Sequence, residues 1–264
     1  MPKVLRIINR FNLGGPTYNA AYLTKYLEPD FETLLVGGYK DETEEKSDFI
    51  VKNIGIEPVI IPEMRRSINF KDDLKAYKIL SGIIRDFKPD IVHTHASKAG
   101  FLGRYAAYKN NVPVIVHTFH GHVFHSYFKN YKSFIYKNIE RYLAKVSTKI
   151  IAISELQKEE LAFKYKIAPA DKITVIPLGF DLNKFRENQD LKRKAFREKY
   201  LIANDEIAIG IVGRLVPIKN HKLFIDSIVS VSKNSSHKIR AFIVGDGECR
   251  SDLEQYALSQ GVEI

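Results

Sequence analysis

The chain has 264 residues, 45% of them hydrophobic, which is enough for one large domain or two small ones with packed cores. It lacks an apolar run near the roughly 18 residues that a membrane-spanning helix needs, and the run 4–8 ends at Asn9 and Arg10, so we expect no secretory leader. A single cysteine, Cys249, excludes an intrachain disulfide and fits a reducing cytoplasm. The net charge of +10 indicates an anionic partner, which could be nucleic acid, a phosphorylated small molecule or an acidic membrane surface.

Short apolar runs alternate with amphipathic segments along the first 180 residues. The expected strands are 4–8, 33–36, 59–61, 91–94, 114–118, 149–153 and 173–176. The expected helices are 17–27, 41–53, 72–87, 98–109 and 155–165, the last one capped by Ser154. This order predicts an α/β fold with a doubly wound parallel sheet.

Two glycines, Gly14 and Gly15, follow the first expected strand and precede its helix. Glycines allow backbone N–H groups to approach a ligand closely, as in phosphate-binding loops. Gly-Gly-Pro is also an ordinary turn, and the full Gly-x-Gly-x-x-Gly spacing is missing. From these residues alone, both interpretations stay open.

A second α/β unit is expected after a connector at 177–186 and a highly charged helix at 192–200. Its strands are expected near 207–212 and 241–244, which gives domains 1–180 and 181–264. Two strands and two helices cannot close a sheet with two covered faces, so we expect this second domain to be incomplete.

The segment 207–220 contains a strand, a glycine and a basic loop in that order. A run as apolar as 207–212 is typical of a parallel strand that is covered on both faces. Gly213 ends the strand, Arg214 and Lys219 follow, and Asn220 is a candidate cap for a helix whose apolar residues are Leu223, Phe224, Ile225 and Ile228. Two cations beside a helix N-terminus can bind a diphosphate, while the alternative is a solvated loop with two unrelated charges.

Six of the eight histidines lie between His93 and His125. A zinc site is conceivable, but no cysteine or nearby acidic residue accompanies them, so we expect no metal. We expect His93 and His117 to be hydrogen-bonded side chains inside strands. His120 differs, because it follows a strand end beside Gly121, where an α/β sheet binds its ligand and where a histidine can hydrogen-bond a polar substrate.

The segment 123–146 interleaves aromatic residues with lysines and arginine. One helical face of it is apolar and is predicted to be core: Phe128, Tyr131, Ile135, Ile139, Tyr142 and Val146. The remaining aromatic and basic residues could bind an acidic membrane, stack on nucleic acid or form a solvated face. With the irregular basic loop near 65, the candidate membrane-side residues are Arg65, Arg66, Lys129 and Lys132.

Taken together, the motifs resemble those of glycosyltransferase family 4, the retaining GT-B enzymes that transfer a sugar from a nucleotide donor. The resemblance runs over nearly the whole chain. In the first domain it rests on Gly14-Gly15 and on the segments 88–95, 98–104, 117–121 and 151–155. It continues in the segments 175–181, 213–215 with Lys219, and 244–247.

The resemblance implies two Rossmann-like domains, the first for the acceptor and the second for the donor. It implies that Arg214 and Lys219 neutralise the leaving diphosphate, that Gly14, Gly15 and Gly213 belong to the donor site, and that His120 lies by the donor sugar. It also implies no metal or other cofactor for the chemistry. Its partners would be a nucleotide-sugar, a UDP-sugar by analogy, and a polysaccharide or lipid-linked oligosaccharide acceptor. The protein would then be cytoplasmic and peripheral on the inner face of the plasma membrane.

Two departures from the family pattern stand out. Leu178 occupies a connector position where the family usually has asparagine. The Glu-x7-Glu segment that grips the donor would lie beyond Ile264, so we expect the chain as given to bind donor weakly. Three rival functions remain: a GT-B sugar-nucleotide epimerase, a nucleic-acid binder and a non-catalytic remnant. The nucleic-acid binder is disfavoured, because the basic residues are spread out and no recognition motif appears.

Overall fold

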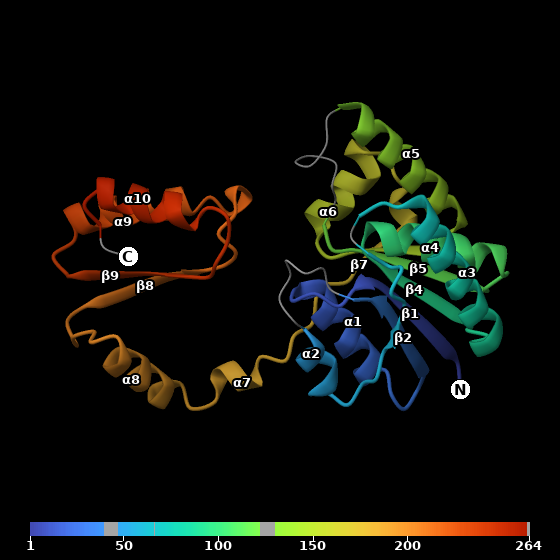
Figure 1. The fold of residues 1–264 in the computed structure, drawn as a ribbon, viewed down its shortest axis with the longest axis horizontal. Coiled ribbons are helices and arrows are strands. Elements are labelled where there is room, and N and C mark those ends of the chain that lie inside the picture. The colour runs from blue at the N-terminus through green and yellow to red at the C-terminus, as the bar shows by residue number, and fades with distance from the viewer. Residues whose placement is uncertain (40–46, 66, 122–129, 263–264) are drawn as a thin grey trace. The chain divides into compact units, whose positions relative to one another are not determined.

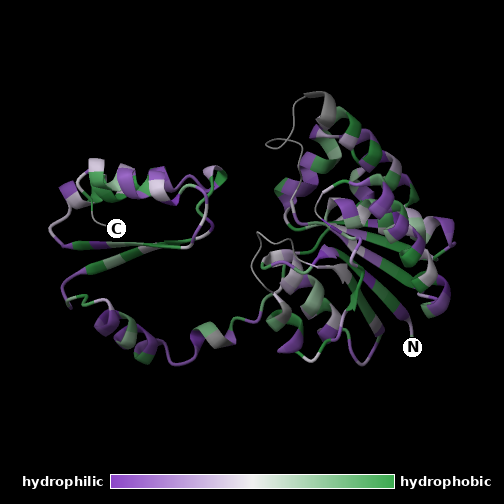
Figure 2. Cartoon of the chain, viewed as in Figure 1, coloured by the Kyte–Doolittle hydropathy of each residue, from purple (hydrophilic) through white to green (hydrophobic). Residues whose placement is uncertain are grey.

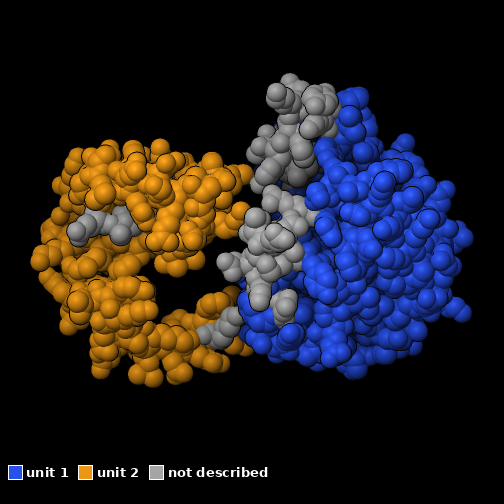
Figure 3. Space-filling model, in the orientation of Figure 1, with its two compact units in different colours: residues 1–181 blue, residues 182–264 orange. Residues whose placement is uncertain are grey.

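The computed structural model describes residues 1–39, 47–65, 67–121 and 130–262. The chain divides into two compact units, Met1–Asp181 (unit 1) and Leu182–Ile264 (unit 2), which Figure 3 distinguishes by colour. Both units are α/β, and all the strand pairs described in them are parallel, so the predicted fold class is confirmed.

Unit 1 is built on a seven-stranded sheet with the order β3-β2-β1-β4-β5-β6-β7 (Figure 1). The strands are β1 Lys3–Arg10, β2 Glu32–Gly38, β3 Val59–Ile60, β4 Ile91–His95, β5 Val114–Phe119, β6 Lys149–Ala152 and β7 Ile173–Val175. The chain moves outward from β1 to β3 on one side and from β4 to β7 on the other. The order therefore reverses between β1 and β4, and ligands of open α/β sheets bind outside the carboxyl ends of strands at such a point.

Helices cover both faces of this sheet. They are α1 Gly15–Tyr26, α2 Asp48–Lys52, α3 Phe70–Phe87, α4 Ser97–Lys109, α5 Asn130–Val146 and α6 Glu155–Glu159, which continues as a π-helical turn at Glu160–Lys164. On one face, α1 packs against β1 and β2 and neighbours α2. On the other, α4 packs on β1, β4 and β5 between α3 and α5.

The sequence of β1 explains how it joins both layers. All its residues from Val4 to Asn9 are buried, as expected for a parallel strand with two covered faces. Leu5 and Ile7 belong to the core cluster with α3 and α4, and Ile8 belongs to the cluster with α1. Figure 2 shows the hydrophobic strands enclosed between helices with mixed surfaces.

Two helix starts follow directly from capping residues. The Asn69 side chain accepts hydrogen bonds from the backbone N–H groups of Lys71 and Asp72 at the start of α3. Ser154 accepts one from the Gln157 N–H at 3.2 Å and so caps α6, as the sequence predicts. Both caps satisfy N–H groups that have no partner within the helix.

The predicted core face of α5 is wrong at two positions, whereas two others, Ile139 and Val146, are half-buried. Ile135 and Tyr142 are 53% and 47% exposed, whereas Leu143 and Ala144 are buried. On the buried side of the helix, Glu140 of α5 forms an ion pair with Arg104 of α4, with 2.6 Å between Oε2 and Nη2. Phe128 of that face lies outside the described residues.

Unit 2 contains two parallel strands, β8 Ile207–Val212 and β9 Ile239–Val244. Its helices are α7 Asn183–Arg186, α8 Gln189–Lys199, α9 His221–Asn234 and α10 Arg250–Ser259, with a 3-10 turn at Pro217–Lys219. The small core joins Leu215, Ile225, Leu253 and Ala257.

The expectation that β8 is covered on both faces is wrong for the described part of unit 2. Ile207 is 43% exposed and Val212 is 80% exposed. The described helices pack on β9 instead: α9 contacts it on one side, and Phe196 and Tyr200 of α8 pack edge-on against Phe242. β8 is therefore apolar but only half covered.

Candidate functional site

A column of polar side chains lies on the α1 face of the unit 1 sheet. Strand register places Arg6 of β1 beside His93 of β4, and places Ile8 beside His95. His120 follows the carboxyl end of β5, as predicted from the sequence. The His95 and His120 rings are stacked, with their centroids 5.2 Å apart, and the His93 and His95 rings are 4.2 Å apart. The column therefore runs from the middle of the sheet to its carboxyl edge.

Arg6 forms the buried base of this column, and its side chain has no exposed surface. Its guanidinium donates to His93 Nδ1 at 2.6 Å, to Thr24 Oγ1 at 3.1 Å and to the Leu23 carbonyl at 3.3 Å. All three partners are neutral acceptors. Burial lowers the pKa of Arg6 to about 9, which leaves the group charged at neutral pH.

The histidines of the column are held neutral. Burial, reinforced by the nearby Arg6 charge, lowers the pKa of His93 and His95 well below 6.5. Burial also lowers the pKa of His120 to about 4. At neutral pH, His120 is therefore a hydrogen-bonding group and carries no charge.

His117 faces the opposite side of the sheet. Its Nδ1 lies 2.8 Å from Thr94 Oγ1, and its ring packs against Gly100 of α4, where a Cβ would come within 2.6 Å. His93 hydrogen-bonds Thr118 Oγ1 at 2.8 Å as well as Arg6. The prediction that His93 and His117 are hydrogen-bonded residues inside strands is confirmed.

The glycine pair lies at the start of α1, where Gly14 is the N-cap residue and Gly15 the first helical residue. A Cβ on Gly15 would meet nothing within 4 Å, so packing within the unit does not require glycine there. The Thr17 hydroxyl donates to the Asn12 carbonyl at 2.7 Å and ties the loop to the helix. In this first turn Pro16 has no N–H and the Thr17 N–H already donates to the Gly14 carbonyl at 3.1 Å, so the Gly14 and Gly15 N–H groups are the candidate donors to a ligand.

The unit 2 loop is held by its backbone. Gly213 N–H donates to the Val244 carbonyl at 3.0 Å, and Leu215 N–H donates to the Asp246 carbonyl at 2.9 Å. A Cβ on Gly245 would overlap the carbonyl of Gly213. The loops after β8 and β9 therefore touch directly, which only glycine permits at this point.

Two exposed cations, Arg214 and Lys219, lie along this loop before α9 begins. Asn220 occupies the N-cap position of α9 in a left-handed conformation, but its side chain makes no capping bond. His221, the first residue of α9, is 2% exposed, and neither ring nitrogen has a hydrogen-bond partner in the described structure. The backbone N–H groups at the start of α9 and the two cations lie in one short segment, as the sequence predicts for an anion site.

The candidate membrane-side residues are only partly described. Arg65 is exposed and donates to the Pro62 carbonyl at 3.4 Å. Arg66 and Lys129 lie outside the described residues, and for Lys132 only the backbone is described. The proximity of these four residues therefore stays a prediction.

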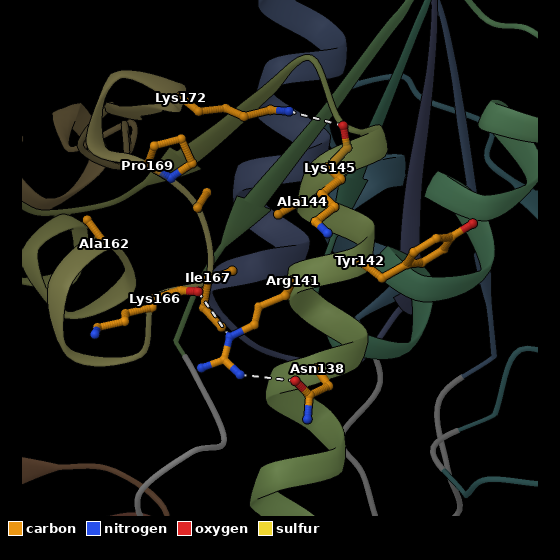
Figure 4. A pocket seen from close by; sticks show the side chains of 11 residues that line it. Asn138, Arg141, Tyr142, Ala144, Lys145, Ala162, Lys166, Ile167, Pro169 and Lys172 are labelled. Carbon is orange, nitrogen blue, oxygen red and sulfur yellow. Dashed lines mark hydrogen bonds between the residues drawn. The ribbon is translucent and has the colours of Figure 1, made fainter.

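A hollow of about 770 Å³ opens between α5 and the segment before β7 (Figure 4). Arg141 bridges it by donating to the carbonyls of Tyr165 and Lys166, and Lys172 donates to the Lys145 carbonyl. Lys145 precedes β6 and Lys172 precedes β7, so the hollow lies at the amino ends of these strands. It is separate from the carboxyl edge where His120 lies.

Sequence reasoning missed Arg6 and His221. An arginine inside an otherwise apolar strand was the available indication for Arg6, because a buried charge needs dedicated partners. His221 had no such indication.

In the described ranges, no helix has the length and hydropathy to cross a bilayer, and no cluster of three or more His, Cys, Asp or Glu side chains is arranged to hold a metal.

Solved structures with this fold include a glycosyltransferase from Rickettsia africae, with a TM-score of 0.70 and 21% identity over 99% of this chain and 66% of that chain. A UDP-GlcNAc 2-epimerase from Neisseria meningitidis gives a TM-score of 0.62 and 16% identity over 98% of this chain and 69% of that one. At these identities the likeness shows the fold alone. The chain has the GT-B fold, which glycosyltransferases and epimerases share.

Comparison with protein-family models identifies the family within this fold. The model of Glycosyltransferase Family 4 matches residues 14–184, and that of Glycosyl transferases group 1 matches residues 192–264. The chain belongs to glycosyltransferase family 4, and the predicted resemblance is confirmed.

Two curated relatives illustrate the match. Over 203 residues the chain is 36% identical to the UDP-Gal:alpha-D-GlcNAc-diphosphoundecaprenol alpha-1,3-galactosyltransferase of Escherichia coli, covering 75% of this chain and 51% of that protein. Over 198 residues it is 30% identical to the capsular polysaccharide biosynthesis glycosyltransferase CapM of Staphylococcus aureus, covering 74% and 51%. The chain spans about half the length of these relatives.

Proposed function

We propose that this chain contributes to a retaining glycosyltransferase that moves a hexosyl or N-acetylhexosaminyl group from a nucleotide-sugar to a polysaccharide or lipid-linked oligosaccharide. The observation that carries the proposal is the unit 2 loop, where Arg214 and Lys219 precede the N-terminus of α9. A UDP-sugar donor is supported by the name of the Escherichia coli relative. The same name, with its diphosphoundecaprenol acceptor, supports a lipid-linked acceptor.

The chemistry follows from where charge develops. As the bond between sugar and phosphate breaks, negative charge grows on the departing diphosphate. Arg214 and Lys219 neutralise that charge, and the first N–H groups of α9 donate to the phosphate oxygens. Gly14 and Gly15 offer backbone N–H groups to the donor phosphates, and His120 contacts the donor sugar as the bond breaks. In this proposal the two cations stabilise the leaving group, and no metal or cofactor is required.

The test compares two cations of unit 2. A version of the protein as long as its curated relatives is incubated with a radiolabelled UDP-sugar and a lipid-diphosphate-linked sugar acceptor, and labelled product is counted. Lys219→Ala should slow turnover by roughly a hundredfold, the scale for losing one preorganised stabilising donor. Lys233→Ala, at the far end of α9, is the matched control and should change little. Near-normal turnover in both Arg214→Ala and Lys219→Ala would contradict the proposal.

An epimerase is the second candidate, because solved UDP-GlcNAc 2-epimerases share the fold. The two functions differ in what they need. An epimerase converts the nucleotide-sugar without an acceptor, whereas a transferase leaves its sugar unchanged until acceptor is added. Sugar analysis after incubation with donor alone distinguishes the two.

We also propose a cytoplasmic protein that binds peripherally to the inner face of the plasma membrane through the outer face of α5. Phe134, Ile135 and Tyr142 are exposed there, and Lys145 lies on the same helix. Exposed aromatic residues beside lysines favour an anionic bilayer surface. The fraction of the protein that sediments with acidic vesicles should decrease as the salt concentration rises. It should be lower again in the variant Phe134→Ser. Equal binding to neutral vesicles would contradict the proposal.

A further inference from the structure

Two ring nitrogens in the histidine column have no hydrogen-bond partner among the residues that the structure describes. His95 Nδ1 lies 2.9 Å from His120 Nε2, which accounts for one nitrogen of each ring. The remaining nitrogens, His95 Nε2 and His120 Nδ1, are buried and unpaired in the described structure. Buried polar atoms are nearly always paired, so the location of the protons on these rings matters.

The first proton position follows from Arg6. A guanidinium has only donors, so the 2.6 Å contact requires His93 Nδ1 to be an unprotonated acceptor. The proton of neutral His93 is then on Nε2, which donates to Thr118 Oγ1 at 2.8 Å. Arg6 thus fixes one tautomer of His93 and keeps the ring beneath His95 uncharged.

His95 and His120 share one hydrogen bond, and two arrangements satisfy it. If His120 donates from Nε2, the proton of neutral His95 is left on Nε2 as an unpaired N–H with no exposed surface. If His95 donates from Nδ1, its Nε2 is left as an unpaired acceptor and the free N–H moves to His120. Each arrangement therefore leaves one unpaired donor and one unpaired acceptor, and both nitrogen atoms are buried. We favour the second arrangement, because it places the unpaired N–H on His120, whose ring is partly exposed at the sheet edge, and not on His95, which has no exposed surface.

We propose that His95 is a positioning residue that donates from Nδ1 to Nε2 of His120 and thereby holds His120 as its Nδ1–H tautomer, with a free N–H for an oxygen of a bound ligand. That the ligand oxygen is a sugar hydroxyl rests on the proposed function. The tautomer itself does not depend on it, so the two can fail separately.

The tautomer is measured by NMR on the whole chain labelled with ¹⁵N-histidine. Long-range ¹H–¹⁵N spectra distinguish protonated from bare ring nitrogens, and His120→Gln identifies the His120 signals. We expect a proton on Nδ1 of His120 in the wild type, and a mixture with the Nε2–H form in His95→Phe. A proton on His120 Nε2 in the wild type overturns the proposal.

The catalytic consequence is measured with His95→Phe, His95→Asn and the control His117→Phe. His117 is equally buried and has one side-chain hydrogen bond, but it faces the other side of the sheet. We expect kcat to fall about tenfold in His95→Phe with little change in the donor KM, and to recover partly in His95→Asn, whose amide can occupy the Nδ1 position. His117→Phe should lower stability without this split between kcat and KM. Equal kcat in His95→Phe and wild type overturns the positioning role, whereas a wild type without turnover contradicts only the proposed function.

Discussion

The two units place their polar groups by different means. In unit 1, polar side chains are positioned by hydrogen bonds to other side chains. Arg6, His93 and Thr118 form a buried hydrogen-bonded series, and His95 is hydrogen-bonded to His120. In unit 2, the backbone holds the loop, because glycines bring the ends of β8 and β9 into contact. A site built from buried side chains is rigid but sensitive to protonation. A site built from backbone is insensitive to pH but intolerant of added side-chain atoms.

Acid should affect unit 1 most. Burial lowers the pKa of His93, His95 and His117 below the value of about 6.5 that they have in the unfolded chain. Below pH 6.5 the unfolded state binds more protons than the folded state. Above pH 6.5 these histidines do not lower the free energy of unfolding. Below pH 6.5 the free energy of unfolding falls as the pH drops, by up to about 1.4 kcal/mol per pH unit for each histidine.

Hydrogen exchange of β4 and β5 amides between pH 7 and 5 measures this loss, after correction for the intrinsic exchange rate. The variant His117→Phe should show a shallower dependence, because one titrating group is removed. If the pH dependence in this variant equals that of the wild type, the lowered pKa of His117 does not contribute to the loss of stability in acid.

The next largest effect is expected for the ion pair between Arg104 and Glu140. Glu140→Ala leaves the Arg104 guanidinium buried without its carboxylate and should lower the unfolding free energy by about 3–5 kcal/mol. The control is Glu254→Ala, which removes an exposed pair with Arg250 in unit 2. It should have no measurable effect, because exposed pairs are screened by water. Urea unfolding followed by circular dichroism compares the two variants, and equal midpoints would refute the contrast.

His120→Ala tests the proposed contact with the donor sugar. We expect turnover to fall by roughly tenfold to a hundredfold while UDP affinity changes little, because the contact belongs to the transition state. His120→Gln keeps a donor and should retain more activity. Calorimetry with UDP and initial rates give the two quantities. A loss that comes only from weaker UDP binding would make His120 a structural residue.

Gly245→Ala tests how unit 2 depends on its backbone. The added Cβ would overlap the Gly213 carbonyl, so the two loops must separate, at an expected cost of about 1–3 kcal/mol. Gly210→Ala in β8 is the control, because its Cβ would meet Phe242 atoms at ordinary distances of 3.7 Å and 3.8 Å. Urea unfolding of unit 2 and UDP titration measure both. Similar behaviour of the two variants would show that the close approach is unimportant.

Much of the fold could be predicted because it depends on local pattern. The apolar run Ile207–Val212 is the strand β8, residue for residue, and Ser154 caps a helix as expected. Counting from the apolar run of β5 is enough to place His120 at a strand end. Such features are decided by neighbours in sequence, which a single chain displays directly.

The rest depended on partners far apart in sequence. Glu140 lies on the buried side of α5, where it pairs with Arg104, 36 residues away. Burial keeps the histidine column neutral, and the charge of Arg6, 87 residues before His93, reinforces this at His93 and His95. Hydrophobic periodicity predicts every charged residue to be exposed. It does not indicate which charged residue is buried beside a partner that is distant in sequence.

The half-covered strand β8 has a consequence for how a preparation of these 264 residues behaves at high concentration. Its six residues carry no charge and no proline, Val212 is 80% exposed, and in the described part of unit 2 its outer edge is not paired with another strand. Such an edge is a template on which a second chain can add a strand, the first step of aggregation. Val212→Lys should therefore slow the growth of light scattering in concentrated samples. Natural sheets commonly protect exposed edges with lysine in this way.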